Sequence, residues 1–118
     1  LRPEFRVFYD FDRHQPLYVV NYWDWAYCHN AICRSLTDKI VYEAYYPTLL
    51  DQYNQLKDGV VEMVAADMEN VAGLSSIWSV DVLYCEPQEY HKGYEGFWLI
   101  DMAVGPRSAY WNPELAKG

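Results

Sequence analysis

Residues 48–72 read TLLDQYNQLKDGVVEMVAADMENVA, and this stretch decides the fold that the sequence predicts. Its apolar residues recur at steps of three or four, the spacing that places side chains on one face of a helix. They are Leu49, Tyr53, Leu56, Val60, Val64, Met68 and Val71. Pro47 disfavours helix in the residue before it, Thr48 stands at an N-cap position, and Gly73 stands at a left-handed C-cap position. The pattern predicts one long helix over about 48–72.

The opposite face of this helix is polar and acidic. Its residues also recur at helical spacing and are Asp51, Gln55, Asp58, Glu62 and Glu69. Asp58 and Glu62 are like charges at i and i+4, which disfavour a helix by about 0.2–0.5 kcal/mol. A basic partner surface would explain both, and the alternative is a solvated helix face. Asp58 and Glu62 are therefore candidate partner-binding residues.

Two runs after the helix have strand character. Residues 77–85 (IWSVDVLYC) alternate as a strand does, and a polar loop over 86–93 follows them. In residues 94–104 (YEGFWLIDMAV) one face carries Tyr94, Trp98, Ile100, Met102 and Val104. The other face carries Phe97 and Leu99. Strands that are apolar on both faces are typically covered on both. We therefore expect the helix on one side and another subunit on the other, with Phe97 and Leu99 as candidate contacts.

The sequence before the helix predicts a hairpin and then an ambiguous segment. Residues 5–12 (FRVFYDFD) and 17–23 (LYVVNYW) are rich in aromatic and β-branched residues and predict two antiparallel strands. Residues 24–46 fit either a short helix over about 25–36 with a strand over 39–46, or a helical hairpin broken at Pro47. We favour the first, because the later part of this segment is rich in β-branched and aromatic residues.

These elements predict an α+β fold: a mostly antiparallel sheet of about five strands with the long helix on one face. A chain of 118 residues suits one domain, which we assign to residues 1–105. Residues 106–118 show no hydrophobic period and are expected to form an extended tail carrying Tyr110 and Trp111. Leaving such rings in water forgoes roughly 1.5–3 kcal/mol each. The tail therefore docks either on this domain or on a neighbouring subunit, and both rings are candidate partner contacts.

Charge, hydropathy and cysteine content indicate which partners and which compartment to expect. The formal net charge is −8, from 17 acidic and 9 basic residues, and Lys and Arg do not cluster. Phosphate backbones are bound by Lys and Arg, so no nucleic-acid partner is expected. No apolar run reaches the ~18 residues of a membrane span, so no membrane is expected. The three cysteines are an odd count without a disulfide framework, so we expect a soluble protein in a reducing, intracellular compartment.

Groups with catalytic or metal-binding chemistry are few. Five Cys and His residues could hold zinc, but C-x-x-C and H-x₃-H spacings are absent, and no metal is expected. Asp10 and Asp12 lie beside His14, and another acidic segment contains His91; these four residues are weak pocket candidates, because paired carboxylates can act as acid and base. No Gly-rich nucleotide motif occurs, so no cofactor is expected.

Three functions fit these observations. We favour a structural or interaction subunit of a homo- or hetero-oligomeric assembly, because aromatic residues are abundant and no catalytic motif occurs. The second is a module that binds a small apolar ligand in an aromatic-lined cavity, and the third is an enzyme that uses the Asp, Glu and His clusters. The strand–strand–helix–strand–strand order over 17–104 resembles small phage connector and tail-terminator proteins in topology only. No diagnostic residue matches, and their N-terminal helix has no counterpart before residue 17. This resemblance implies a virion connector-type role and a virion-associated location.

Overall fold

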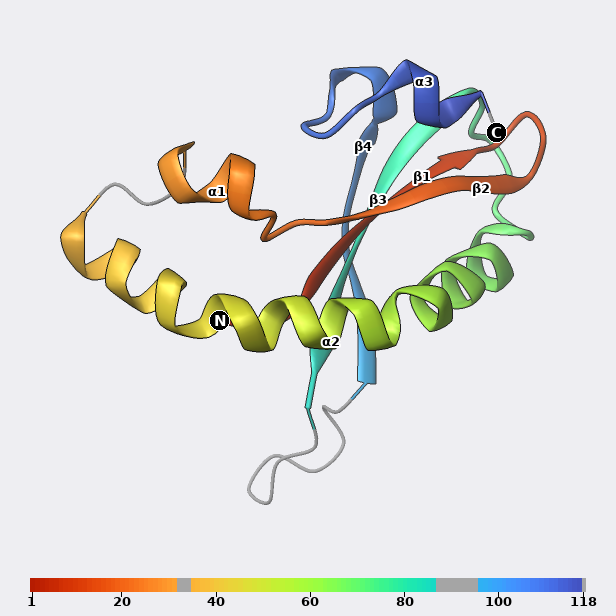
Figure 1. Cartoon of the computed structure of the whole chain (residues 1–118). Helices are drawn as coiled ribbons and strands as arrows, with labels where there is room; N and C mark the ends of the chain where they lie inside the picture. The colour runs from red at the N-terminus through yellow and green to blue at the C-terminus, as the bar shows by residue number, and fades with distance from the viewer. Residues whose placement is uncertain (32–34, 87–95, 118) are drawn as a thin grey trace.

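The computed structural model of the chain describes residues 1–31, 35–86 and 96–117. Its elements are β1 Glu4–Asp10, β2 Gln15–Asn21, α1 Trp25–Ala31, α2 Leu36–Met68, β3 Ile77–Cys85, β4 Gly96–Val104, the 3-10 turn η1 Gly105–Arg107 and α3 Pro113–Ala116. One antiparallel sheet packs against one long helix (Figure 1), which confirms the predicted α+β fold. The short helix expected near 25–36 is α1.

The sheet has the strand order β2-β1-β3-β4, and all neighbours are antiparallel. Side chains of a strand alternate between the two faces of a sheet. In β1, Phe5 and Val7 join the core under α2, so Arg6 and Phe8 point to the opposite face. The sheet has four strands within the described residues rather than about five. The strand predicted over 39–46 is wrong, because these residues belong to α2.

Helix α2 is 33 residues long, or about 50 Å at 1.5 Å per residue. It begins after Ser35, whose side-chain oxygen accepts the N–H of Asp38 at 3.1 Å. The helix neither starts nor breaks at Pro47, which lies inside it. A proline in a helix interior removes one backbone hydrogen bond. Packing on either side of the proline opposes this loss, because Tyr42 and Leu49 share one helix face and are both buried.

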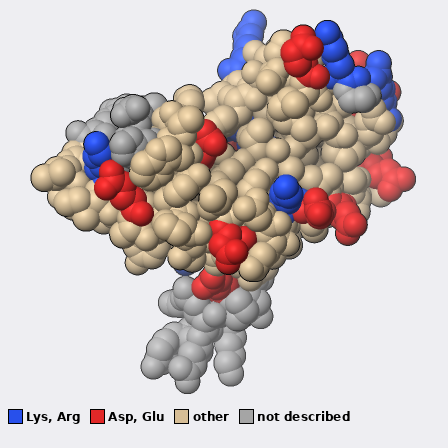
Figure 2. All heavy atoms as spheres, viewed as in Figure 1, with Lys and Arg blue, Asp and Glu red and all other residues tan. Residues whose placement is uncertain are grey.

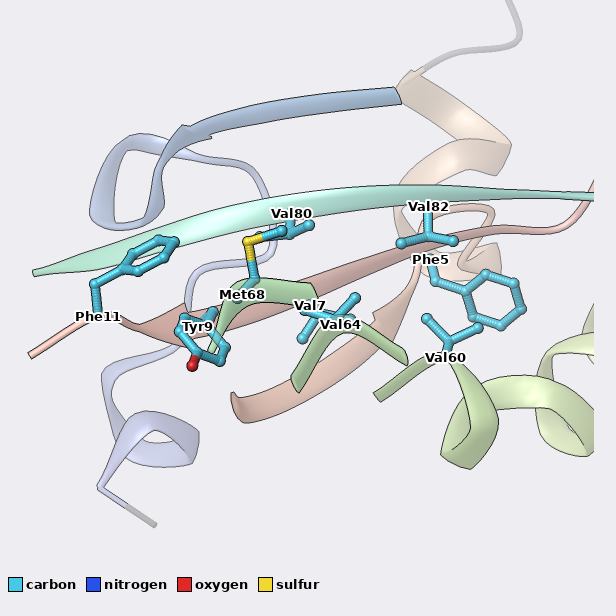
Figure 3. Close-up of a cluster of buried hydrophobic side chains, with 9 residues drawn as sticks. All are labelled: Phe5, Val7, Tyr9, Phe11, Val60, Val64, Met68, Val80 and Val82. Carbon is cyan, nitrogen blue, oxygen red and sulfur yellow. The ribbon is translucent and has the colours of Figure 1, made fainter. Parts of the chain in front are cut away.

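The core lies between the C-terminal half of α2 and the middle of the sheet. Its buried side chains are Phe5, Val7, Tyr9, Phe11, Val60, Val64, Met68, Val80 and Val82 (Figure 3). The ring of Phe5 also stacks on that of Tyr53, with 5.5 Å between the centroids. This half of the predicted helical stripe therefore faces the sheet, as expected.

Gly59 occupies an exposed position in the interior of α2. A Cβ placed there would meet no atom within 4 Å, and glycine is less stable than alanine inside a helix by roughly 0.5–1 kcal/mol. We expect Gly59→Ala to raise the free energy of unfolding in urea by about this amount. Gly105→Ala is the opposite control, because its Cβ would lie 2.7 Å from Cγ2 of Ile77 and should destabilise the fold. A destabilised Gly59→Ala would contradict the open helix surface at this position.

The face of the sheet away from α2 is covered by the C-terminal segment, with α1 at one end (Figure 1). Trp111 packs on Phe8 and Tyr18, with centroid distances of 5.4 and 6.4 Å. The hydroxyl of Tyr18 donates to the C=O of Tyr110 at 3.2 Å and accepts the N–H of Asn112 at 2.8 Å. The segment assigned to an extended tail thus includes a short helix and folds back on the sheet.

Candidate functional site

Strand β4 exposes large apolar side chains along its length. Trp98, Leu99, Ile100 and Val104 are 44%, 41%, 48% and 45% exposed, and we call these four residues the β4 surface. An apolar side chain of this size contributes roughly 1.5–3 kcal/mol when it is fully buried. Single exposed apolar residues are ordinary, whereas contiguous exposed ones mark interaction sites. The β4 surface is therefore the first candidate functional site.

A β-bulge at Ile100 determines which way these side chains point. Asp81 pairs with Asp101 and Val82 pairs with Leu99, so β4 has one more residue than β3 at this point. An extra residue shifts the alternation of the strand by one position. Leu99, Met102 and Val104 therefore lie on the α2 face of the sheet, whereas Trp98 and Asp101, which pair with Leu83 and Asp81, point to the opposite face.

Phe97 also lies on the α2 face. Its ring contacts those of Phe5 and Tyr84, with centroids 6.4 and 5.4 Å apart. The sequence placed Phe97 and Leu99 on the face opposite Met102, and this assignment is wrong because the bulge brings all three to one side. Phe97 is half-buried and packs on the core, whereas Leu99 belongs to the β4 surface.

Both edges of the sheet have features that hinder the addition of a further strand. At the β2 edge, a backbone carbonyl accepts a hydrogen bond from Tyr53 on α2 at 3.2 Å. At the β4 edge, the N–H of Met102 bonds to the side chain of Asp101, and the C=O of Val104 accepts from Ser108, both at 2.9 Å. Such bonds and a bulge hinder the addition of a further strand. The feature of β4 that a partner can use is therefore its side chains.

The N-terminal part of α2 extends past the sheet (Figure 1) and is also apolar. We call residues 36–45 the α2 arm. Its exposed apolar side chains are Leu36, Ile40, Val41 and Tyr45, at 75%, 57%, 41% and 50%. The inner side of the arm packs on α1, where the rings of Tyr42 and Trp25 stack with centroids 5.6 Å apart. Sequence reasoning missed the arm, because it assigned most of these residues to a strand.

The predicted acidic face of α2 is exposed to solvent. This holds for each of its members: Asp51, Gln55, Asp58, Glu62 and Glu69. Figure 2 shows acidic side chains scattered between wide uncharged areas on the side that carries α2. The last turn of α2 contains no basic residue, although the helix dipole favours positive charge there. The partner role of Asp58 and Glu62 stays a hypothesis.

The two aromatic residues of the predicted tail pack on this domain, one of the two expected alternatives. The hydroxyl of Tyr110 donates to the C=O of Tyr22 at 2.7 Å and lies 3.6 Å from Sγ of Cys28. Burial and the contact with Cys28 raise the pKa of Tyr110. Trp111 covers Phe8, which is 0% exposed. Both rings thus contribute to the packing of their own chain.

The predicted acid–histidine cluster forms the turn between β1 and β2. Oδ1 of Asp10 accepts the N–H groups of Asp12 and of the next residue at 2.9 and 3.3 Å. Oδ1 of Asp12 accepts the N–H of Ser76 at 3.1 Å. His14 is exposed with a φ of 53°, and His91 lies outside the described residues. Both carboxylates bond to backbone groups and so hold the turn.

The candidate zinc ligands are only partly described. Cys28 and Cys85 are buried free thiols. Sγ of Cys28 donates to the C=O of Tyr22 at 3.2 Å, whereas Sγ of Cys85 accepts from Arg2 at 3.1 Å. Cys33 lies outside the described residues. In the part of the chain that the structure describes, no three Cys, His, Asp or Glu residues are grouped to hold a metal, and no helix has the length and hydropathy to cross a membrane.

An ion pair is buried on the face of the sheet away from α2, and it was not predicted from the sequence. Arg6 on β1 binds Asp81 on β3 through Nε–Oδ1 and Nη2–Oδ2 distances of 2.8 and 2.9 Å. The two side chains are only 11% and 7% exposed. Arg6 also donates to the C=O of Ala109 at 3.2 Å, which ties the C-terminal segment to the sheet. The available signal was a charge in the interior of each strand, Arg6 in β1 and Asp81 in β3, because buried charges are usually paired.

Glu4 lies beside this ion pair on β1. Burial, and then the charge of Asp81, raise the pKa of Glu4 from 4.5 to about 7, while Arg6 lowers it. A carboxyl group with a higher pKa in the folded protein binds its proton more tightly there than in the unfolded chain. Its ionisation therefore lowers stability as pH rises. This penalty is absent below pH 4.5 and complete above about pH 7.

We expect Glu4→Gln to remove the penalty. The free energy of unfolding in urea should rise by about 1–2 kcal/mol at about pH 8 and change little at about pH 4, after a discount for the partial exposure of Glu4. Glu62→Gln is the matched control, because Glu62 is exposed on α2. An equal gain at both pH values would show that Glu4 does not titrate between them.

Among the hollows formed by the described residues, two lie near α2. The first has a volume of about 310 Å³ and is lined by Leu1, Arg2, Pro3, Tyr45, Thr48, Leu49, Gln52, Tyr84 and Glu86. The second is broad, has a volume of about 510 Å³ and is lined by Trp25, Glu43, Tyr46 and Pro47. A small-ligand site stays a prediction, because neither hollow brings several polar groups together around an enclosed apolar space.

Comparison of the chain with protein-family models, with curated proteins and with solved structures found no match. The topological resemblance to phage connector proteins therefore stays a prediction. The functional inferences below rest on the residues of this chain.

Proposed function

We propose that this chain is a structural subunit that assembles with further copies of itself through exposed apolar side chains. The observation that carries the proposal is the β4 surface, because the four large apolar residues of this edge strand, distributed over its two faces, are each more than 40% exposed. Burial of such side chains favours association. The free energy gained offsets the loss of translational and rotational entropy when two molecules join. Tyr110 and Trp111 already pack on their own chain. We therefore assign the contact with another subunit to the β4 surface rather than to the C-terminal segment.

The net charge of the chain gives this assembly a characteristic salt dependence. Each copy carries a formal net charge of −8, so two copies repel one another at low ionic strength. Salt screens this repulsion while leaving the burial of apolar surface intact. We therefore expect self-association to strengthen as salt is added. An association driven by opposite charges would weaken instead.

Sedimentation velocity at increasing protein concentration tests the proposal. The mean mass of the wild-type chain should rise with concentration, and Ile100→Lys should weaken association at least about tenfold, because a charge would be buried in an apolar contact. Leu115→Lys is the matched control, since Leu115 is 51% exposed but lies on α3. A wild-type chain that stays monomeric at its highest soluble concentration contradicts the proposal. So does an Ile100→Lys chain that associates like wild type.

A further inference from the structure

The helical layer over the sheet is incomplete on one side. The C-terminal half of α2 packs over β1 and β2, where Tyr53 also bonds to the β2 edge. On the same face of β4, Leu99 and Val104 stay 41% and 45% exposed. Because a sheet buries its apolar face by packing against another element, this half of the face would accept a second helix.

The α2 arm has the complementary property. It is a helix that packs on α1 along its inner side and exposes Leu36, Ile40 and Tyr45 elsewhere. A helix that is apolar beyond one stripe is typically buried by a partner. The chain thus has a sheet face that lacks a helix and a helical segment that lacks a sheet. The arm projects beyond the sheet of its own chain (Figure 1), so that sheet does not cover it.

The charges of the two surfaces favour contact between them. Residues 51–69 of the α2 region hold five acidic residues and one lysine, whereas the arm holds two acidic residues and Lys39. Strand β4 carries a single charge, Asp101, which pairs with Asp81 and so points to the face away from α2. The α2 face of β4 is therefore uncharged. In a chain of net charge −8, the arm and this face meet with little electrostatic repulsion.

We infer that the α2 arm of one copy packs on the α2 face of β4 in the next, over Leu99 and Val104. The inference rests on the proposed self-assembly and specifies its geometry. The contact is heterologous, because each copy gives an arm and receives one at a different place. Repetition of such a contact closes into a reciprocal pair or a ring when the rotation allows it.

A mixing experiment distinguishes this contact from symmetric alternatives. Ile40→Glu blocks the arm and Leu99→Glu blocks β4; both positions are exposed, at 57% and 41%, and urea unfolding checks that both variants fold. Each variant alone should self-associate at least about tenfold more weakly than wild type, because its contact would bury a charge. An equimolar mixture should form one-to-one pairs, since the mixture still contains intact arms and intact β4 surfaces.

Other outcomes separate the two proposals. Association of wild type together with wild-type behaviour of Ile40→Glu indicates a β4–β4 contact, and wild-type behaviour of Leu99→Glu indicates an arm–arm contact. Either result, or a mixture that stays monomeric, overturns the inference and leaves self-assembly standing. A monomeric wild type overturns both.

Discussion

Asp81→Ala is expected to lower the free energy of unfolding by about 3 kcal/mol, because removing one partner of a buried ion pair leaves the other charge uncompensated. The side chain of Arg6 is 11% exposed and donates two of its hydrogen bonds to Asp81. Without the carboxylate, the guanidinium either stays buried or moves out and gives up its bond to the C=O of Ala109. Urea unfolding of both chains at neutral pH measures the loss.

A double variant distinguishes the net contribution of the ion pair to stability from the destabilisation caused by removing only one partner. Replacing a buried ion pair by apolar residues of similar volume is often neutral or stabilising. We therefore expect Arg6→Met with Asp81→Leu to recover most of the stability that Asp81→Ala loses. A loss below about 1 kcal/mol in the single variant would place the pair among solvent-screened surface ion pairs. That result would contradict the burial seen here.

The part of the fold that could be predicted follows from hydrophobic periodicity. Val60, Val64 and Met68 recur at helical spacing and pack on the sheet. The alternation in 77–85 matches β3, whose bounds are Ile77–Cys85. In these segments local preference and long-range packing favour the same structure, so a sequence pattern is sufficient. The positive φ of Gly73, 88°, also agrees with the left-handed position expected for it, although α2 ends earlier, at Met68.

The wrong predictions have a common physical origin in contacts between distant segments. The β-branched and aromatic residues of 39–46 favour a strand locally, yet Tyr42 packs on Trp25 and donates to the C=O of Trp23 at 2.7 Å. Tertiary contacts of this kind override propensities of less than about 1 kcal/mol per residue. The bulge at Ile100 has the same origin, because it concerns the register of β4 against β3.

The candidate site was harder to predict than the fold. Leu99 was named from the sequence as a partner contact, but its neighbour Phe97 is packed on the core. Exposure depends on which elements lie over a strand, and α2 packs mainly over β1 and β2. The α2 arm could not be identified while the start of α2 was placed at Pro47. Charge and composition alone carry neither piece of information.

Trp111→Ala is expected to lower the free energy of unfolding by about 2–3 kcal/mol. A fully buried Trp truncated to alanine costs about 3–5 kcal/mol, and Trp111 is only half-buried, so we expect a loss below that range or at its lower end. The ring lies 5.4 Å from that of Phe8, which is 0% exposed. Its removal exposes Phe8 and loosens the stacked pair of Phe8 and Tyr18, whose centroids are 4.7 Å apart. Urea unfolding measures the change.

The same variant separates packing within the chain from docking on a neighbour. If Trp111 stabilises its own domain, Trp111→Ala loses stability while its self-association, measured by sedimentation where the variant is still folded, stays that of wild type. A ring that served a neighbouring subunit would give the reverse, with unchanged unfolding and lost association. Leu115→Ala in the same segment is the control, because Leu115 is 51% exposed and its truncation should cost less than about 0.5 kcal/mol. The C-terminal segment then belongs to the packed domain, and association does not require Trp111.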